Sequence, residues 1–301
     1  MQLVISQWSP SFTDNADGPS RSQAADLQVN VEVAAEHWGP VPARGAPPES
    51  VVLVDGVQRF DAHVELTDED LRHPGLCASW AAGAVRCDST VGQSEVIAAE
   101  VQRALFTSAE RAPSTAYYPA VEVPDSQLDD LTGAVQAARG ALERAISSII
   151  AADSELVVVD GSLRGQETLP QAVGYIKSHH RSYLAGGAAK TITDLRPGQR
   201  TPVFHLTTDW SRYSWYVRLP STSRQGWAGI ARLEASSDLD GEEVVRLADQ
   251  TVTALPRFAS VAYKDARAPQ NLTPIAGLER HLKRKLGDPR LLLRSLRSAA
   301  S

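Results

Sequence analysis

The chain has 301 residues and a hydrophobic content of 43%, which is enough for one large packed domain or two small ones. Its net charge of −6 excludes a protein that coats nucleic acid or an anionic membrane through overall charge. Cys77 and Cys87 are too few for a disulfide framework and too far apart for a C-x-x-C site, so a reducing, cytoplasmic setting is expected. The short apolar run after Met1 predicts no secretory signal, and no stretch reaches the roughly 20 apolar residues that span a membrane.

The first part of the chain lacks the patterns of regular structure. Residues 1–49 are rich in Pro, Gly, Ser and Ala, which predicts an irregular N-terminal extension with one strand around residues 27–33. The organised domain is expected over residues 50–301. It opens with an aliphatic run at residues 50–56 that ends in Asp-Gly, a pattern typical of a buried strand meeting a turn, and residues 57–66 are expected to form the partner strand.

Helices and strands are expected to alternate along the rest of the chain. A helix is expected over 93–110 and a stronger one over 125–152, where apolar residues recur every three or four positions. A second aliphatic run, residues 155–163, follows and contains the same Asp-Gly pair. Further strands are expected at 172–177, 203–207, 215–219 and 229–235, and further helices at 241–254 and 275–298. This order predicts a mixed α/β sheet with flanking helices.

The two Asp-Gly pairs are the most informative local features. If the two strands are neighbours, the side chains of Asp55 and Asp160 converge at one place on a rigid sheet. Converging carboxylates form an all-oxygen site that suits Mg²⁺ or Mn²⁺, and such ions catalyse phosphodiester hydrolysis. The alternative is that each Asp-Gly pair only makes a turn.

Three further positions are candidates for the same chemistry. Glu143 lies at the edge of the apolar face of the helix over 125–152, although a glutamate four residues after Arg139 is also typical of a solvated ion pair. Lys177 and Arg181, in and just past the strand at 172–177, are candidates for phosphate contacts. The alternative for these two cations is an ordinary polar connection between elements.

Aromatic residues and arginines alternate at residues 210–227. Rings interleaved with arginines can stack on the bases of a single strand, but such rings are also common in protein cores. Because side chains alternate along a strand, one of Trp215 and Tyr216 is expected to point inward and the other outward.

The order of these features resembles that of the NurA family of nucleases. In that family a V-D-G strand end, a glutamate on a later helix, a V-V-x-D-G-S-L strand end and a V-G-x-x-K-S segment follow one another. Here the same features read Val54-Asp55-Gly56, Glu143, Val157-Val158-Val159-Asp160-Gly161-Ser162-Leu163 and Val173-Gly174-Tyr175-Ile176-Lys177-Ser178. The resemblance covers roughly residues 50 to 290.

The resemblance implies an RNase H-like core in a homodimer. It implies a manganese-dependent nuclease that processes DNA ends with a hexameric HerA-type ATPase, in recombination repair or antiphage defence. By position, Asp55, Glu143 and Asp160 would be the catalytic metal ligands for Mn²⁺ or Mg²⁺, and Tyr216 would match a functional tyrosine.

The chain departs from the family pattern near its C-terminus. Family members carry a histidine after a Pro-containing segment, and no histidine occurs over residues 264–272 of this chain. Asp265 is a candidate oxygen ligand there, and Arg267 and Asn271 are candidate phosphate contacts. The departure supports a rival interpretation, a catalytically decayed subunit that guides DNA for an ATPase. A weaker third alternative is a metal phosphohydrolase that acts on nucleotides.

Charge is unevenly divided along the chain. Residues 264–301 hold nine Lys and Arg against three Asp and Glu, a balance of +6, which leaves residues 1–263 at −12. Leucines recur within this basic segment, so it predicts a pair of helices broken at residues 287–289, with one packed face and one cationic face. This cationic face is expected to guide DNA towards the acidic centre, and the alternative is a merely solvated basic helix.

Overall fold

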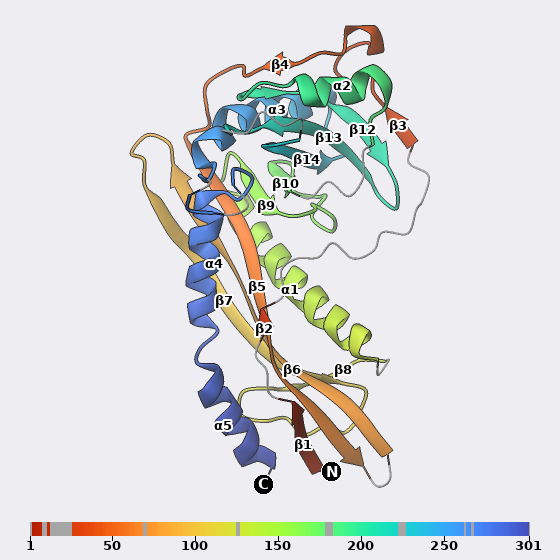
Figure 1. The fold of residues 1–301 in the computed structure, drawn as a ribbon, viewed down its shortest axis with the longest axis vertical. Helices are drawn as coiled ribbons and strands as arrows, with labels where there is room; N and C mark the ends of the chain where they lie inside the picture. The colour runs from red at the N-terminus through yellow and green to blue at the C-terminus, as the bar shows by residue number, and fades with distance from the viewer. Residues whose placement is uncertain are drawn as a thin grey trace.

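The computed structural model describes residues 2–7, 11–12, 26–68, 71–124, 127–177, 183–221, 227–261, 263–265 and 268–300. These residues form a large mixed β-sheet with helices on both faces (Figure 1). The predicted α/β class, a mixed central sheet flanked by helices, is therefore confirmed.

The strands are β1 (Gln2–Gln7), β2 (Ser11–Phe12), β3 (Asp26–Gln28), β4 (Val41–Pro42), β5 (Ser50–Asp68), β6 (Leu71–Asp88), β7 (Ser94–Thr107), β8 (Ala120–Glu122), β9 (Val157–Asp160), β10 (Ala172–Ile176), β11 (Gln199–Arg200), β12 (Phe204–Thr207), β13 (Ser211–Arg218) and β14 (Ile230–Ser236). The helices are α1 (Leu128–Ala151), α2 (Gly186–Asp194), α3 (Gly241–Ala254), α4 (Thr273–Lys285) and α5 (Pro289–Ala300), with short 3₁₀ turns at Ala35–His37 and Leu255–Phe258.

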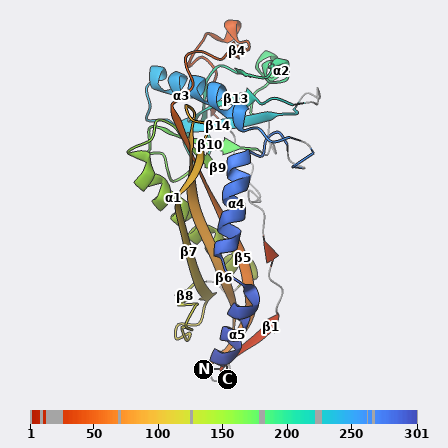
Figure 2. The same cartoon turned by 90° about the vertical axis from the view of Figure 1, so that its left-hand side faces the viewer.

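The centre of the sheet runs in the order β7–β6–β5–β9–β10. β5, β9 and β10 are parallel, whereas β6 is antiparallel to both β5 and β7. This is the RNase H-like arrangement that the resemblance implies. β5, β6 and β7 extend well beyond β9, and they form an elongated arm along which α4 and α5 follow one another (Figures 1 and 2).

Each face of the sheet has its own hydrophobic core. Leu53 and Val57 of β5 pack with α3 and α4 on one face, whereas Val52 and Val54 pack with α1 on the other. This division follows from the alternation of side chains along a strand. β5 is therefore buried on both sides, which explains why its sequence is almost continuously aliphatic between residues 51 and 54.

Two expectations near the start of the domain are wrong. Asp55-Gly56 makes no turn, because β5 continues through residue 68 and pairs with β6 across this point, Asp55 opposite Gly83 and Gly56 opposite Ala82. The helix expected over 93–110 is the strand β7, whose backbone pairs with residues 75–87 of β6.

Other elements agree with their predictions. α1 and α3 occupy the ranges where helices were expected. The C-terminal helical segment is interrupted between Lys285, the last residue of α4, and Pro289, the first of α5, as the Gly-Asp-Pro sequence predicts. β6 and α2 were not among the expected elements.

Part of the N-terminal segment packs against the sheet. β3 pairs with β12, and the carboxylate of Glu32 accepts hydrogen bonds from both terminal nitrogens of buried Arg200, at 2.7 and 2.9 Å. A division of the chain at residue 50 stays a prediction. Within the described residues, no helix has the length and apolar character needed to cross a membrane.

Candidate metal centre

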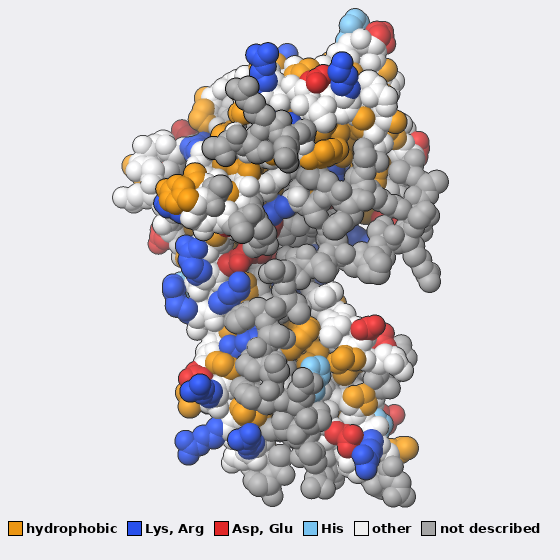
Figure 3. Space-filling view, viewed as in Figure 1, with side chains coloured by type: hydrophobic (Ala, Val, Ile, Leu, Met, Phe, Trp, Pro, Cys, Tyr) orange, Lys and Arg blue, Asp and Glu red, His pale blue; other side chains and the backbone are white. Residues whose placement is uncertain are grey.

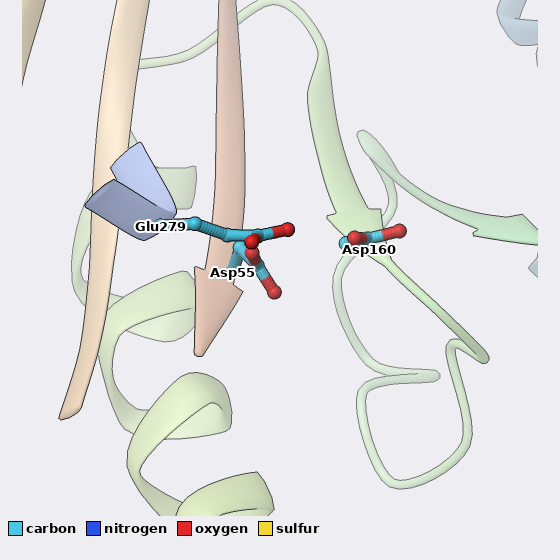
Figure 4. A group of neighbouring side chains, drawn as sticks. All are labelled: Asp55, Asp160 and Glu279. Atoms are coloured by element: carbon cyan, nitrogen blue, oxygen red, sulfur yellow. The ribbon is translucent and has the colours of Figure 1, made fainter. Parts of the chain in front are cut away.

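Three carboxylates meet on the α4 side of the sheet. Asp55 comes from β5, Asp160 from the end of β9 and Glu279 from α4, and each offers an oxygen within 4.8 Å of the others (Figure 4). The two aspartates are adjacent because β5 and β9 pair in parallel, with Val54 opposite Val159. The strands are therefore neighbours, and the aspartates converge as expected for that case. We call Asp55, Asp160 and Glu279 the carboxylate cluster.

A glycine on the neighbouring strand allows α4 to approach the cluster. Gly83 of β6 lies opposite Asp55, and a Cβ atom there would stand 3.2 Å from Leu278 Cδ1 and 3.1 Å from Leu282 Cδ2. Both leucines are buried in the core between α4 and the sheet. Glu279, the residue after Leu278, is thereby held at the sheet surface beside Asp55.

Glu279 was not among the predicted site residues. The available signal was its place in the sequence, between Leu278 and Leu282 on the apolar edge of an expected amphipathic helix. An acidic residue at the edge of an apolar helix face can be exposed to solvent without a role, or it can belong to a functional site, and the sequence does not distinguish the two. The decisive fact, that α4 lies over β5, comes from the tertiary structure.

Glu143 approaches from the opposite face of the sheet and is not part of the carboxylate cluster. It extends from α1 into the space left by Gly56, where a Cβ atom would stand 2.1 Å from Glu143 Oε1. The predicted pair with Arg139 is present at 3.5 Å, but it is buried and not solvated. Glu143 and Glu279 therefore approach from different faces of the sheet, because α1 and α4 cover different faces. The predicted role of Glu143 as a metal ligand stays a prediction.

Glu143 nevertheless interacts electrostatically with Asp55 and Asp160 of the cluster. Burial raises the pKa of its carboxyl, an effect that Arg139 opposes and the charge of Asp160 reinforces. Among the described residues, no group donates a hydrogen bond to its buried Oε1 atom. A buried carboxylate oxygen of this kind suits a cation, a solvent molecule or a proton as its partner.

Replacement of Gly56 by alanine is expected to destabilise the protein by about 1–3 kcal/mol, because the new methyl group overlaps the Glu143 carboxylate and displaces it. Denaturant unfolding of the two proteins measures this difference. Gly133→Ala, at an exposed position of α1, is the control, since a Cβ atom there contacts nothing within 4 Å. It is expected to stabilise the protein by up to about 1 kcal/mol through the higher helix propensity of alanine. A Gly56→Ala protein as stable as the wild type would contradict the placement of Glu143.

The clustered acids repel one another. Burial raises the pKa of the Asp55 carboxyl well above its ordinary value, and the charges of Asp160, Glu143 and Glu279 raise it further. The Lys177 ammonium lowers this pKa, but it is the weakest of these influences. Asp55 is also oriented by its own backbone, because the Gly56 amide donates a hydrogen bond of 2.7 Å to Asp55 Oδ1.

Lys177 lies beside the cluster, as its predicted role requires. Its Nζ atom is 2.6 Å from Asp160 Oδ2 and donates a longer hydrogen bond of 3.4 Å to Asn271 Oδ1. Asn271 is itself buried and donates to the carboxylate of Asp265. Asn271 therefore holds Lys177 and Asp265 in place, and its predicted contact with phosphate stays a prediction.

The turn after Asp160 is anchored by a buried glutamate on β14. Ser162 Oγ donates a hydrogen bond of 3.0 Å to Glu234 Oε2, and the Leu163 amide donates to the same oxygen at 3.4 Å. Gly161 has a φ of 110°, a conformation that side chains rarely adopt. The Gly-Ser-Leu sequence thus serves to turn the chain sharply beside the cluster.

The expectation that one of Trp215 and Tyr216 points outward is wrong, and a functional role for Tyr216 stays a prediction. Trp215 and Tyr216 are both fully buried, on opposite faces of β13, because helices cover both sides of the sheet. Tyr216 is therefore inaccessible to DNA in this structure, and burial raises its pKa to about 12. The predicted phosphate contacts Arg181 and Arg267 lie outside the described residues.

The donor set fits a hard divalent cation. All three clustered groups offer carboxylate oxygens, the ligands that Mg²⁺ and Mn²⁺ prefer, and none of the three offers nitrogen or sulfur. Burial, followed by the charges of the neighbouring acids, raises the pKa of Asp55, and a bound cation would favour its charged form.

The fold has a counterpart among solved structures. The NurA nuclease from Sulfolobus solfataricus aligns over 88% of this chain and 88% of its own, with a TM-score of 0.54 and 11% sequence identity. This chain has a NurA-like fold. Endonuclease V from Bacillus subtilis aligns over 81% of this chain and 86% of its own, with a TM-score of 0.36 and 12% sequence identity. The catalytic domain of human endonuclease V aligns over 80% of this chain and 85% of its own, with a TM-score of 0.33 and 19% sequence identity. No protein-family model and no curated protein matches the sequence.

Proposed function

We propose that this protein is a metal-dependent DNA nuclease that processes DNA ends. The observation that carries the proposal is the carboxylate cluster, which two central strands, β5 and β9, and the helix α4 form in a NurA-like fold. The cluster also favours a nuclease over a decayed guiding subunit, because a subunit without chemistry gains nothing from three crowded acids that destabilise the fold.

The clustered carboxylates would hold Mn²⁺ or Mg²⁺, with Glu143 as a further carboxylate on the other side of β5. When bound, such an ion supplies an activated water and neutralises the charge that develops on the leaving oxygen. Asp55 and Asp160 are fixed by adjacent strands, so their oxygens are already oriented. Lys177, whose Nζ atom is 2.6 Å from Asp160 Oδ2, would contact the scissile phosphate.

The finer parts of the proposal rest on the family resemblance. They are a homodimer, a hexameric HerA-type ATPase as the partner that delivers DNA, and a role in recombination repair or antiphage defence. A cytoplasmic setting is proposed from the cysteine content instead. Elution of the chain together with such an ATPase, and cleavage that increases when ATP is added, would support this assembly.

The function is tested with end-labelled duplex DNA and the purified protein. We expect cleavage in Mn²⁺ and none in EDTA, because EDTA removes the metal ion and the carboxylates alone do not activate water. Thymidine 5′-(p-nitrophenyl phosphate) serves as the small-substrate comparison. Rapid hydrolysis of this ester without cleavage of DNA would favour the nucleotide phosphohydrolase, and inactivity on both substrates would favour the guiding subunit.

A further inference from the structure

We propose that the outer side of α4 and α5 binds the phosphate backbone of duplex DNA and leads it to the carboxylate cluster. The inference rests on the proposed function, because DNA is the polyanion that such a nuclease must bring to its site. The surface, called here the cationic face, consists of Arg280, Arg284, Lys285, Arg290, Arg294 and Arg297, all of which are exposed.

The spacing of these residues places them along one side of each helix. Arg280 and Arg284 are four residues apart on α4, and Arg290, Arg294 and Arg297 recur at four and three residues on α5. Residues at these spacings are neighbours on a helix surface. Figure 3 shows Lys and Arg side chains gathered over α4 and α5, on the same side of the arm.

The charges of the cationic face have no partners among the described side chains. None of its six residues forms an ion pair or a side-chain hydrogen bond there, whereas neighbouring Lys283 pairs with Glu279 at 3.2 Å. Like charges three or four residues apart destabilise a helix, so the arrangement is costly unless an anion binds it. A polyanion would relieve the repulsion along the whole face.

The cationic face begins at the carboxylate cluster. Arg280 follows Glu279 directly on α4, and the remaining cations lead away from the cluster along the arm. From residue 280 to residue 297 the helices rise by about 25 Å at 1.5 Å per residue, a length of about seven base pairs. A duplex that lies on this face would therefore have one end at the cluster.

DNA fits the cationic face better than a lipid surface does. A basic helix binds membranes by inserting an apolar side among the lipid chains. In α4 and α5 the apolar side is buried inside the protein. Leu282 and Leu286 pack against the sheet, and Leu292 and Leu296 pack into the core of the arm. Phosphate binding requires only the exposed charges.

The test is a binding assay in EDTA, so that it needs no catalysis. A fluorescein-labelled duplex longer than the face is titrated with protein at several KCl concentrations between about 50 and 200 mM, the range in which phosphate contacts weaken strongly. For the combined variant Arg290→Gln, Arg294→Gln and Arg297→Gln we expect binding to weaken at least about tenfold. We also expect the slope of log affinity against log salt to decrease by about 2.7, which corresponds to three phosphate contacts.

The matched control removes the same charge elsewhere. Arg44→Gln, Lys190→Gln and Arg196→Gln alter exposed cations at the other end of the molecule, near β4 and α2. This control is expected to bind within about twofold of the wild type. Equal losses in the two variants would overturn the inference, because net charge alone would then explain the binding.

Other outcomes separate this inference from the proposed function. Wild-type binding by the α5 variant overturns the inference even if the protein cleaves DNA, whereas selective loss of binding supports it even if the protein does not. If the α5 variant fails to fold, Arg280→Gln with Arg284→Gln is expected to reduce the slope by about 1.8. Tighter binding to phosphatidylserine vesicles than to the duplex would identify a lipid surface as the partner and overturn the inference.

Discussion

Asp160→Asn is expected to reduce Mn²⁺-dependent DNA cleavage by more than about 100-fold. Loss of a group that only supports a metal ligand already costs up to about 100-fold, and Asp160 is proposed as a ligand itself. The change removes one charge and one oxygen ligand from the cluster while keeping the shape of the side chain. It also deprives Lys177 of its carboxylate partner. Single-turnover cleavage of end-labelled duplex, at equal protein concentration, measures the effect.

Asp153→Asn is the control for this substitution. Asp153 is exposed and lies seven residues earlier, just after α1, so its loss leaves the cluster unchanged. Both variants should retain the far-ultraviolet circular dichroism of the wild type. Equal cleavage by Asp160→Asn and the wild type would remove Asp160 from the site.

Mn²⁺ is expected to stabilise the folded protein by about 2.7 kcal/mol when its concentration is 100 times its dissociation constant. The stabilisation should increase with pH. In the folded protein without metal, the pKa of Asp55 is raised above its ordinary value of 3.8, and that of Glu143 above 4.5. Protons therefore compete with Mn²⁺ for the cluster as pH falls through these raised values.

The protein without metal should show the opposite trend. A carboxyl whose pKa is raised by folding binds more protons in the folded state, so the free energy of unfolding decreases as pH rises from the ordinary pKa through the raised one. Thermal unfolding with and without Mn²⁺, at pH values between about 5 and 8, measures both trends. Asp55→Asn should weaken both, and a Mn²⁺ effect that is constant with pH would contradict the crowding of the acids.

The parts of the site that depend on local sequence were predictable. The aliphatic runs ending at Asp55 and Asp160 indicate buried strands, and the three-to-four spacing in α1 indicates a helix. The pairing of β5 with β9 was only a condition, under which the two aspartates would converge, because no local pattern shows which strands are neighbours. Each of these inferences uses residues that are close together in the chain.

The parts that depend on distant contacts were not predictable. Val96, Ile97, Val101 and Leu105 fit a helical spacing, but hydrogen bonds to β6 make this segment a strand. Asp-Gly is typical of turns, yet strand β6 pairs straight across Gly56. Such pairing overrides local propensity, which is weak by comparison.

Burial of side chains was equally hidden in the sequence. The alternation at Trp215 and Tyr216 suggested that one ring faces solvent, but α2 and α3 cover the two faces of that part of the sheet. Glu279 escaped notice for a related reason. Its importance depends on Gly83, almost two hundred residues earlier, which brings α4 close to β5.

The cluster is assembled from positions 55, 160 and 279, so its members are synthesised at very different times. A nascent chain that ends before α4 can already contain both aspartates, but it has neither the glutamate nor the helix that covers them. On the proposed function, such an unfinished polypeptide has no complete centre for cutting DNA. If the proposed function holds, a cell is therefore protected from truncated products of translation, because the site is complete only after α4 has been made and has docked.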